Sequence, residues 1–567
     1  MLRHAPTATA IATVLLIGCG GGSSKSDGGA GMGGSVSGGS TGTAGGGGGG
    51  AGGSTGGSGN TAGAAAPPTG SLVFQGLSAL LDAGPPCASE LGATGDRWCG
   101  FLANSTTVTD GTALFVVNVS KAAAGTSITC GVADDNCLKL TDNFWEDQFH
   151  LAFFQGDTLV YYDRPTATSP FTPVGWRPGM TAGRVLAVAD ANTDLWSCVP
   201  STKGNAIWCL RDLPTAMQTD PNVLLSDLLA GHLDATATPP LARIETVISI
   251  NAADSVNLPH FQVGFPVPGS ETIAWSARAV GSGPEVLKVQ TMGNDASRVT
   301  VASGVNSWRG SPDGMRWYWL SAVSETNGAG TLQTAPFPAG TSPVTIGTNV
   351  GQYAQPSATS LLTVDSAKAM KVFADQVGAP TTGTSLDTGV LGFISVSPAG
   401  HPAYVKMTRT SSATGELTGI DLWVKKFDGT DACTLTATAD AFPSNFGFTP
   451  SSTGATWIQT TLTSGDAQYT RFSDCMKMPV ANNVVFTRSI GDRAVLYLDG
   501  FDDITGTATV TARKLDAAHG LTADPASVVS GQVGTLMVSS STTTDMLIYT
   551  VNGGGNADGV YVRGFGP

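Results

Sequence analysis

The chain has 567 residues, and charged side chains make up only 13% of them. Its formal net charge of −14 argues against nucleic acid or an anionic membrane surface as the partner of its folded part. Thr, Ser, Val and Gly are abundant, which favours many short strands with frequent turns over solvated helices.

Residues 1–18 have the pattern of an export signal. Arg3 and His4 begin it, and the apolar run of residues 8–17 is far shorter than the roughly 20 residues that span a bilayer. The run leads into the letters LIGC, residues 16–19. These letters resemble the lipobox of bacterial lipoproteins, which has a branched apolar residue three before the cysteine and a small residue directly before it. The alternative is an ordinary cleaved signal peptide with an unrelated cysteine.

The lipobox resemblance implies that Cys19 carries a lipid. In that family the thiol receives a diacylglycerol, the chain is cut before the cysteine, and the new amino group is usually acylated too. Two or three acyl chains anchor a protein firmly, at about 0.8 kcal/mol per buried methylene, whereas one alone is marginal. We therefore expect a lipid anchor in a bacterial membrane of the cell envelope, the outer membrane, with the folded part in the periplasm or at the cell surface.

Residues 19–70 form a linker that is nearly half glycine, with Ser, Thr and Ala between. Such a chain behaves as a coil whose ends lie about 35 to 42 Å apart, so it is expected to be a disordered tether. Two matches to the G-x-S-x-G hydrolase pattern, at Ser40 and Ser54, fall inside it. They are accidents of composition, because that motif needs a strand before it and a helix after it.

Eight cysteines remain if Cys19 is lipidated, an even number in an exported chain, which predicts disulfides. A hairpin with the turn STKGN, residues 201–205, places Cys198 and Cys209 on facing strands. A zinc site is the weaker alternative, because no C-x-x-C pair or neighbouring histidine supplies ligand spacing. The grouping along the chain favours four local pairs: Cys87 with Cys99, Cys130 with Cys137, Cys198 with Cys209, and Cys433 with Cys475.

Residues 71–567 are long for one ordinary core, which stops growing at roughly 250 to 300 residues, so the chain either splits into domains or repeats. Residues 285–322 run as strand, turn, strand, loop, then the letters SPDG at 311–314 and an aromatic strand. This order resembles the repeat of TolB-type β-propellers, in which Ser-Pro-Asp-Gly makes the tight turn before an inner strand. Residues 394–407 and 420–460 are degenerate echoes of it, with Ser397-Pro398 and Thr449-Pro450 in the place of Ser-Pro.

The resemblance implies an all-β fold, a propeller of about seven or eight four-stranded blades. The strand of residues 71–77 is expected to complete the last blade, near the C-terminus. The alternative is a pair of β-sandwiches with unrelated turns. Aromatic markers of the inner strands recur at a mean spacing of about 46 residues: Trp275, Trp317, Phe373, Tyr404, Trp457, Tyr497 and Tyr549.

Candidates for chemistry are few, and we expect no catalytic residue, cofactor or metal. Residues 190–196 place Asp190, Asn192 and Asp194 as a calcium loop would, but Leu195 stands where the glycine turn belongs. The carboxylates of residues 499–503 suit a hydrated hairpin better than a metal. The histidines are scattered, without paired ligand spacing: His150, His232, His260, His401 and His519.

The sequence therefore predicts a membrane-anchored lipoprotein whose propeller is a binding module, with an envelope protein or a glycan as partner and no nucleic acid. Prolyl-oligopeptidase relatives add a hydrolase domain after such a propeller, and the chain is expected to lack one. The alternative function is a propeller enzyme, such as a polysaccharide lyase or hydrolase, with its site at the mouth of the channel.

Overall fold

The computed structural model describes most of residues 71–565. The longer breaks in the described part are 76–86, 89–94, 105–111, 131–134, 146–152, 187–194, 202–204, 213–222, 234–240, 252–261, 279–283, 338–341, 375–380, 411–416, 426–431, 437–441, 461–464, 503–506, 517–519, 522–525, 541–544 and 552–558, with breaks of one or two residues elsewhere. The signal of residues 1–18, Cys19 and the linker of residues 19–70 therefore lie outside the described residues.

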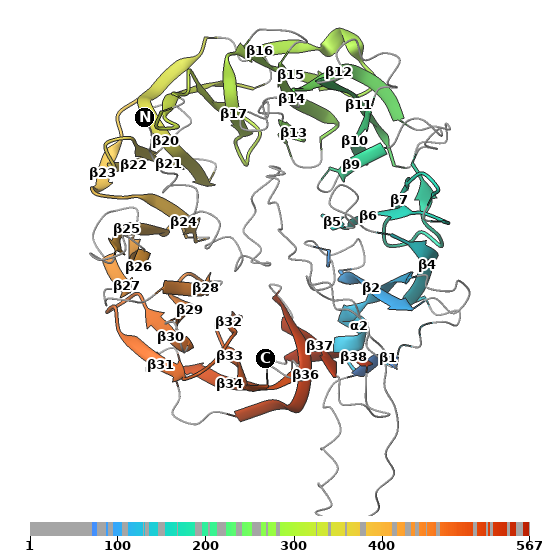
Figure 1. The fold of residues 1–567 in the computed structure, drawn as a ribbon, viewed down its shortest axis with the longest axis vertical. Coiled ribbons are helices and arrows are strands. Elements are labelled where there is room, and N and C mark those ends of the chain that lie inside the picture. The colour runs from blue at the N-terminus through green and yellow to red at the C-terminus, as the bar shows by residue number, and fades with distance from the viewer. Residues whose placement is uncertain are drawn as a thin grey trace, which may run out of the picture.

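Antiparallel sheets make up nearly all of the described chain, and they follow one another in chain order around a ring (Figure 1). A short helix, α2 (Val119–Ala123), follows the second strand of the first sheet, and its first turn is capped by the Asn118 side chain. No helix in the described part is long and apolar enough to cross a membrane.

Four of the sheets have four strands each, as the sequence predicts for a blade. Their strands are β9 (Leu195–Pro200), β10 (Ala206–Asp212), β11 (Val223–His232) and β12 (Leu241–Asn251); β13 (Gln262–Gly264), β14 (Thr272–Arg278), β15 (Glu285–Thr291) and β16 (Val299–Ser303); β24 (Gly392–Val396), β25 (Pro402–Thr410), β26 (Leu417–Lys425) and β27 (Ala432–Thr436); and β28 (Phe442–Phe448), β29 (Gly454–Thr460), β30 (Gly465–Arg471) and β31 (Lys477–Ala481).

The other three sheets have seven, seven and eight strands, so the expectation of four-stranded sheets throughout is wrong. Their strands are β2 (Trp98–Asn104), β3 (Thr112–Asn118), β4 (Cys137–Phe144), β5 (Phe153–Gln155), β6 (Thr158–Asp163), β7 (Thr172–Trp176) and β8 (Arg184–Val185); β17 (Val305–Gly310), β18 (Arg316–Ser321), β19 (Gly330–Pro336), β20 (Val344–Ser357), β21 (Ser360–Asp365), β22 (Met370–Phe373) and β23 (Thr384–Asp387); and β1 (Ser71–Gln75), β32 (Thr487–Ile490), β33 (Ala494–Asp502), β34 (Thr507–Asp516), β35 (Gly520–Leu521), β36 (Ala526–Ser540), β37 (Asp545–Val551) and β38 (Gly559–Phe565).

Two long strands explain two of the larger sheets. The first half of β20 pairs with β19 and its second half with β21, and Val350 is opposite residues of both neighbours. β36 joins β34 to β37 in the same way, through Val533. Each of these strands therefore ends one run of four strands and begins the next, and we call such a run of four a unit.

The first and last strands of the described chain lie side by side. β1 pairs antiparallel with β38, with Ser71 opposite Val562 and Gln75 opposite Gly559. The predicted completion of the last sheet by the strand that begins at residue 71 is thus present. The pairing places the end of the glycine-rich linker at the sheet that contains the C-terminal strands.

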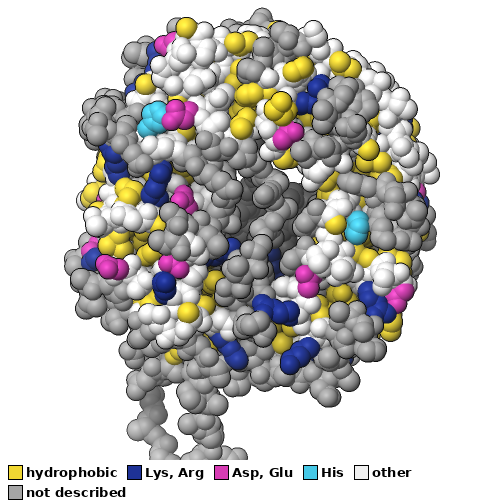
Figure 2. Space-filling model, turned by 180° about the vertical axis from the view of Figure 1, so that it is seen from behind, with side chains coloured by type: hydrophobic (Ala, Val, Ile, Leu, Met, Phe, Trp, Pro, Cys, Tyr) yellow, Lys and Arg dark blue, Asp and Glu magenta, His cyan; other side chains and the backbone are white. Residues whose placement is uncertain are grey.

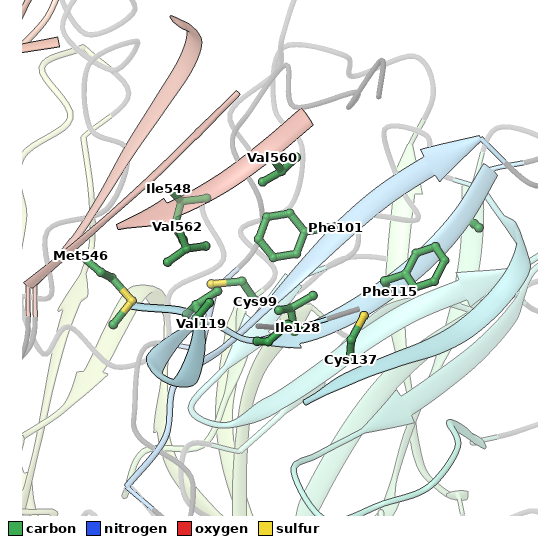
Figure 3. Packing of buried hydrophobic residues seen from close by; sticks show 13 residues of the cluster. Cys99, Phe101, Phe115, Val119, Ile128, Cys137, Met546, Ile548, Val560 and Val562 are labelled. Carbon is green, nitrogen blue, oxygen red and sulfur yellow. The ribbon is translucent and has the colours of Figure 1, made fainter. Parts of the chain in front are cut away.

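Hydrophobic clusters fill the spaces between successive sheets. Alternation of buried and partly exposed residues along most of β15 and β19 gives each strand one buried side. Figure 3 shows the cluster where the last sheet packs on the first, with Ile548, Val560 and Val562 facing Phe101. Burial of these side chains, at about 25 cal/mol per Å² of apolar surface, holds β37 and β38 against β2 and β3.

The aromatic markers of the repeat are buried, but they do not lie on the innermost strands. Trp275, Tyr404 and Trp457 each occupy the second strand of a unit, in β14, β25 and β29. Phe373 lies one strand further out, in β22. That shift accounts for the irregular spacing of the markers on both sides of Phe373.

Candidate functional site: the inner strands and their turns

The first strand of a unit lies nearest the middle of the ring, as Figure 1 shows for β13, β24, β28 and β32. With β17 and residues 350–357 of β20, these strands are called the inner strands below. Among the described residues, the side chains and turns of these strands lie nearest the middle of the ring. Figure 2 shows one face of the ring, on which acidic and basic side chains are interspersed.

Side-chain amides join successive inner strands. The Gln262 amide in β13 donates to the Trp308 carbonyl at 2.9 Å and accepts from the Trp308 N–H at 3.1 Å. Gln352 in β20 accepts from the Phe393 N–H at 3.2 Å, and Asn445 in β28 donates to the Val485 carbonyl at 3.1 Å. These bonds satisfy strand edges that no ladder partner covers, and they hold neighbouring inner strands at a fixed spacing.

The Ser-Pro-Asp-Gly turn after β17 is closed by the buried hydroxyl of Ser311. Its Oγ accepts from the N–H groups of Met315 and Arg316 at 3.0 and 2.9 Å, and it donates to Asp313 Oδ1 at 2.5 Å. Gly314 adopts a φ of 69°, and a Cβ there would come within 2.6 Å of Val267 Cγ2. At this turn, a first-position hydroxyl closes the backbone, and glycine at the fourth position fits both the positive φ and the close approach of Val267.

The same turn recurs after β24 and β28. The Ser397 hydroxyl accepts from the His401 N–H at 2.9 Å, and the Thr449 hydroxyl accepts from the Gly454 N–H at 3.1 Å. Ser452 takes the positive φ of the fourth position, at 60°, in place of glycine. After β9, at the hairpin that the sequence predicts, the buried Ser201 hydroxyl likewise accepts from the Ala206 N–H, at 3.3 Å.

The turns after β24 and β28 contact each other, and the turn after β28 also contacts Asp492. The Ala399 N–H donates to Ser452 Oγ at 3.1 Å, and Ser451 Oγ donates to Asp492 Oδ1 at 2.6 Å. We call this surface the turn face. It consists of the turns around Val267, Ser311 to Met315, Ala399, Ser451 and Asp492.

The exposed groups of the turn face are both polar and apolar. Asp313, Ser451 and Asp492 are exposed polar residues, whereas Pro312, Ala399 and Met315, which is 66% exposed, are apolar. Their backbone is fixed by the hydrogen bonds within each turn. A partner would therefore meet a pre-ordered surface, and binding would order few loops.

Two acid–aromatic clusters hold neighbouring sheets together further from the middle. Glu245 of β12 accepts from Trp275 Nε1 at 3.0 Å and pairs with the Lys288 ammonium. Between the sheet that contains β23 and the sheet that contains β25, Asp387 of β23 accepts from the Tyr404 hydroxyl and from Lys406 Nζ, each at 2.6 Å.

The Asp387 cluster has shifted proton affinities. Burial alone would raise the pKa of Asp387, but hydrogen bonds from Lys406, Tyr404 and the Thr388 N–H outweigh it, so the pKa lies below its ordinary value. Burial, and then the bond to Asp387, raises the pKa of Tyr404 far above its usual range. The phenol therefore stays protonated and acts as a donor, which suits a structural clamp between sheets.

The predicted disulfide pairs are present: Cys87–Cys99, Cys130–Cys137, Cys198–Cys209 and Cys433–Cys475. The third pair crosses the hairpin of β9 and β10, as its turn predicts. The last pair spans 42 residues and joins β27 to the segment after β30.

The structure does not bring together those of the other candidate residues that it describes. His232 lies 3.4 Å from Glu271, and His401 follows the turn after β24. Asp499 is exposed on β33. Within the described residues no group of three His, Cys, Asp or Glu side chains is placed to hold a metal ion. His150, His260, His519, Asp190, Asn192, Asp194 and Asp503 lie outside the described residues.

No protein-family model matches the chain, and no curated protein matches its sequence. Among solved structures, the chain is similar to a prolyl endopeptidase at 12% identity and a TM-score of 0.35, covering 71% of this chain and 54% of that one. It is similar to a eukaryotic initiation factor at 13% identity and a TM-score of 0.41, covering 76% and 96%. A TolB from Agrobacterium tumefaciens, described as putative, is similar at 16% identity and a TM-score of 0.23, covering 37% and 77%. The chain spans about half the length of the prolyl endopeptidase that it matches.

Proposed function

We propose that the chain is a lipid-anchored lipoprotein whose ring of sheets is a closed, TolB-like propeller that binds a partner at the cell envelope. The partner is another protein or a glycan. The observation that carries the binding role is the turn face, where turns from successive units contact one another through Ala399 with Ser452 and Ser451 with Asp492. A surface assembled from several units on a rigid support can meet a partner at small conformational cost.

The anchor is supported by the letters LIGC at residues 16–19 and by the glycine-rich residues that follow. A tether of that length lets the folded part search tens of ångströms around its attachment point. Metabolic labelling with a fatty acid tests it, comparing the native chain with Cys19→Ser. Label in the native chain alone supports the anchor, and equal or absent label in both chains refutes it.

The binding role is tested by the size of the anchored protein after mild solubilisation of membranes. The native chain should elute as a complex much larger than one chain. Met315→Glu combined with Ala399→Glu places two charges on the turn face and should reduce the complex to a single chain. The matched control, Val185→Glu with Val299→Glu, alters exposed residues of β8 and β16 and should leave the complex intact. Native protein that already elutes as a single chain, with neither protein nor glycan bound, would refute the proposal.

A propeller enzyme is the competing function, and it makes a different prediction. Incubation of the full chain with polysaccharides would release new reducing ends if the protein were a lyase or hydrolase. The binding module proposed above releases none. Turnover by the native protein that is absent from a heat-inactivated control would replace the binding role with the enzymatic one.

A further inference from the structure

A cavity of about 410 Å³ lies where β20 passes from one unit to the next. Its walls are β20, β21, β22 and residues 381–383. The strand bends here because Asn349 adopts a φ of 58°, and the Ser366 N–H holds the bend by donating to the Asn349 carbonyl at 2.8 Å. The volume falls within the range of small-molecule sites, roughly 300 to 1,000 Å³.

Hydroxyl groups dominate the polar lining of this cavity. Thr348 and Thr363 line it from β20 and β21, and Thr381 and Thr382 line it from the segment before β23. A threonine hydroxyl both donates and accepts. Such a lining can hydrogen-bond to the hydroxyl groups of a ligand whether each one donates or accepts. These hydrogen bonds offset the free-energy cost of removing the ligand hydroxyls from water.

An acid and a base face each other across the lining without closing a hydrogen bond. Asp365 Oδ1 accepts from the Ala369 N–H at 2.9 Å, which fixes the carboxylate. Its Oδ2 lies 4.0 Å from Lys371 Nζ, a separation longer than a hydrogen bond. A ligand hydroxyl can bridge this gap by accepting from Lys371 and donating to Asp365. Because the two charges offset each other, the site suits a neutral ligand.

One wall of the cavity is apolar. Phe373 lines it, and Gly383 lies directly on the ring, since a Cβ at that position would come within 2.7 Å of Phe373 Cζ. Glycine at 383 therefore lets the segment close on the ring and shapes the cavity beside it. An aromatic edge beside several hydroxyl groups is a lining that fits a ring with one C–H face and many hydroxyls.

We propose that this cavity binds a neutral saccharide unit, of one or two sugar rings. It is separate from the turn face and names a ligand class that the binding role proposed above leaves open. Failure of one proposal leaves the other standing, because the size of the membrane complex does not depend on the cavity.

The test measures saccharide binding by the full chain carrying Cys19→Ser. Saturation-transfer NMR detects the binding, and titration calorimetry gives its affinity. Glucose, galactose, N-acetylglucosamine and maltose are the probes, with glucuronate and glycerol as comparators. At least one neutral sugar should bind, and glucuronate and glycerol should bind at least tenfold more weakly than that sugar.

Variants of the lining locate the binding. Thr381→Val and Lys371→Met should each weaken the bound sugar about tenfold or more. The matched control Thr300→Val, at an exposed threonine of β16, should leave its affinity unchanged. Binding of no neutral sugar, tighter binding of glucuronate, or affinity that is equal in Thr381→Val and Thr300→Val would overturn the proposal.

Discussion

Ser71 lies opposite Val562, so the first residue after the glycine-rich linker is paired with a strand that ends at Phe565. The pairing joins residues 491 positions apart in the chain, and it covers the edge of β38 that would otherwise be open. The sheet that carries the C-terminal strands is thereby also the sheet at which the proposed tether ends.

Removal of β1 tests how much this pairing contributes to the stability of the folded chain. Deletion of residues 71–75 takes away one strand partner of β38, and at about 1 kcal/mol per net hydrogen bond it should lower the melting temperature by roughly 2 to 5 °C. It should also increase aggregation through the exposed edge. Deletion of five linker residues, 40–44, is the control and should change neither. An unchanged melting temperature on loss of β1 would show that the pairing contributes nothing to stability.

The hairpin disulfide should stabilise its sheet. Replacing both cysteines, Cys198→Ala with Cys209→Ala, should lower the free energy of unfolding by about 2 to 4 kcal/mol. Chemical denaturation with and without reductant measures it, and reductant should affect the variant less than the native chain.

The same bonding pattern predicts that the eight cysteines after Cys19 offer no free thiol. Mass spectrometry of the denatured, unreduced protein after alkylation should show no alkyl group added to them. Two or more added groups would contradict the four pairs.

Asp387 should make stability depend on acid pH. Its pKa in the folded chain lies below its ordinary value, which is about 3.9 in an unfolded chain. Its contribution is therefore complete above about pH 5 and is lost as the pH falls through the folded pKa. Asp387→Asn keeps an acceptor for Tyr404 but not the charge for Lys406, and should cost about 1 to 2 kcal/mol at pH 7.

The difference between the native chain and Asp387→Asn should begin to shrink near the ordinary aspartate pKa and should disappear as the pH falls through the lower folded pKa, where the native carboxyl loses its charge. Thermal unfolding from pH 2 to pH 8 measures it. Asp474→Asn, in an exposed pair with Arg471, should have a smaller effect at pH 7. A difference that stays constant down to pH 2 would mean that the charge of Asp387 does not matter.

The turn hydroxyl should matter more than its small size suggests. Ser311→Ala leaves the N–H groups of Met315 and Arg316 without the acceptor that now closes the turn, and should cost about 1 to 2 kcal/mol. Ser397→Ala should cost a similar amount, because it closes an equivalent turn. Thr300→Ala, at an exposed residue of β16, is the control. A cost at Ser311 no larger than at Thr300 would show that the turn is held by its backbone alone.

Local chemistry explains which features could be predicted from the sequence. The turn after β17 follows from four adjacent residues, and the Cys198–Cys209 pair follows from one hairpin. The Gln262–Trp308 bridge could not be predicted, because the two residues lie 46 positions apart and glutamine carries no signal for such a role. The continuation of β20 through Val350 also depends on packing between units, whereas the sequence predicts four-stranded blades throughout.

Photo-cross-linking in the cell tests the central claim most directly, namely that the turn face of an anchored ring binds an envelope partner. A photoreactive amino acid at Met315, which is 66% exposed, should give a discrete adduct on irradiation. The same probe at Val299, on the outer strand β16, should give none, and Cys19→Ser should abolish the adduct at Met315 by releasing the protein from the membrane. Absence of an adduct at Met315, or equal adducts at Met315 and Val299, would contradict the account.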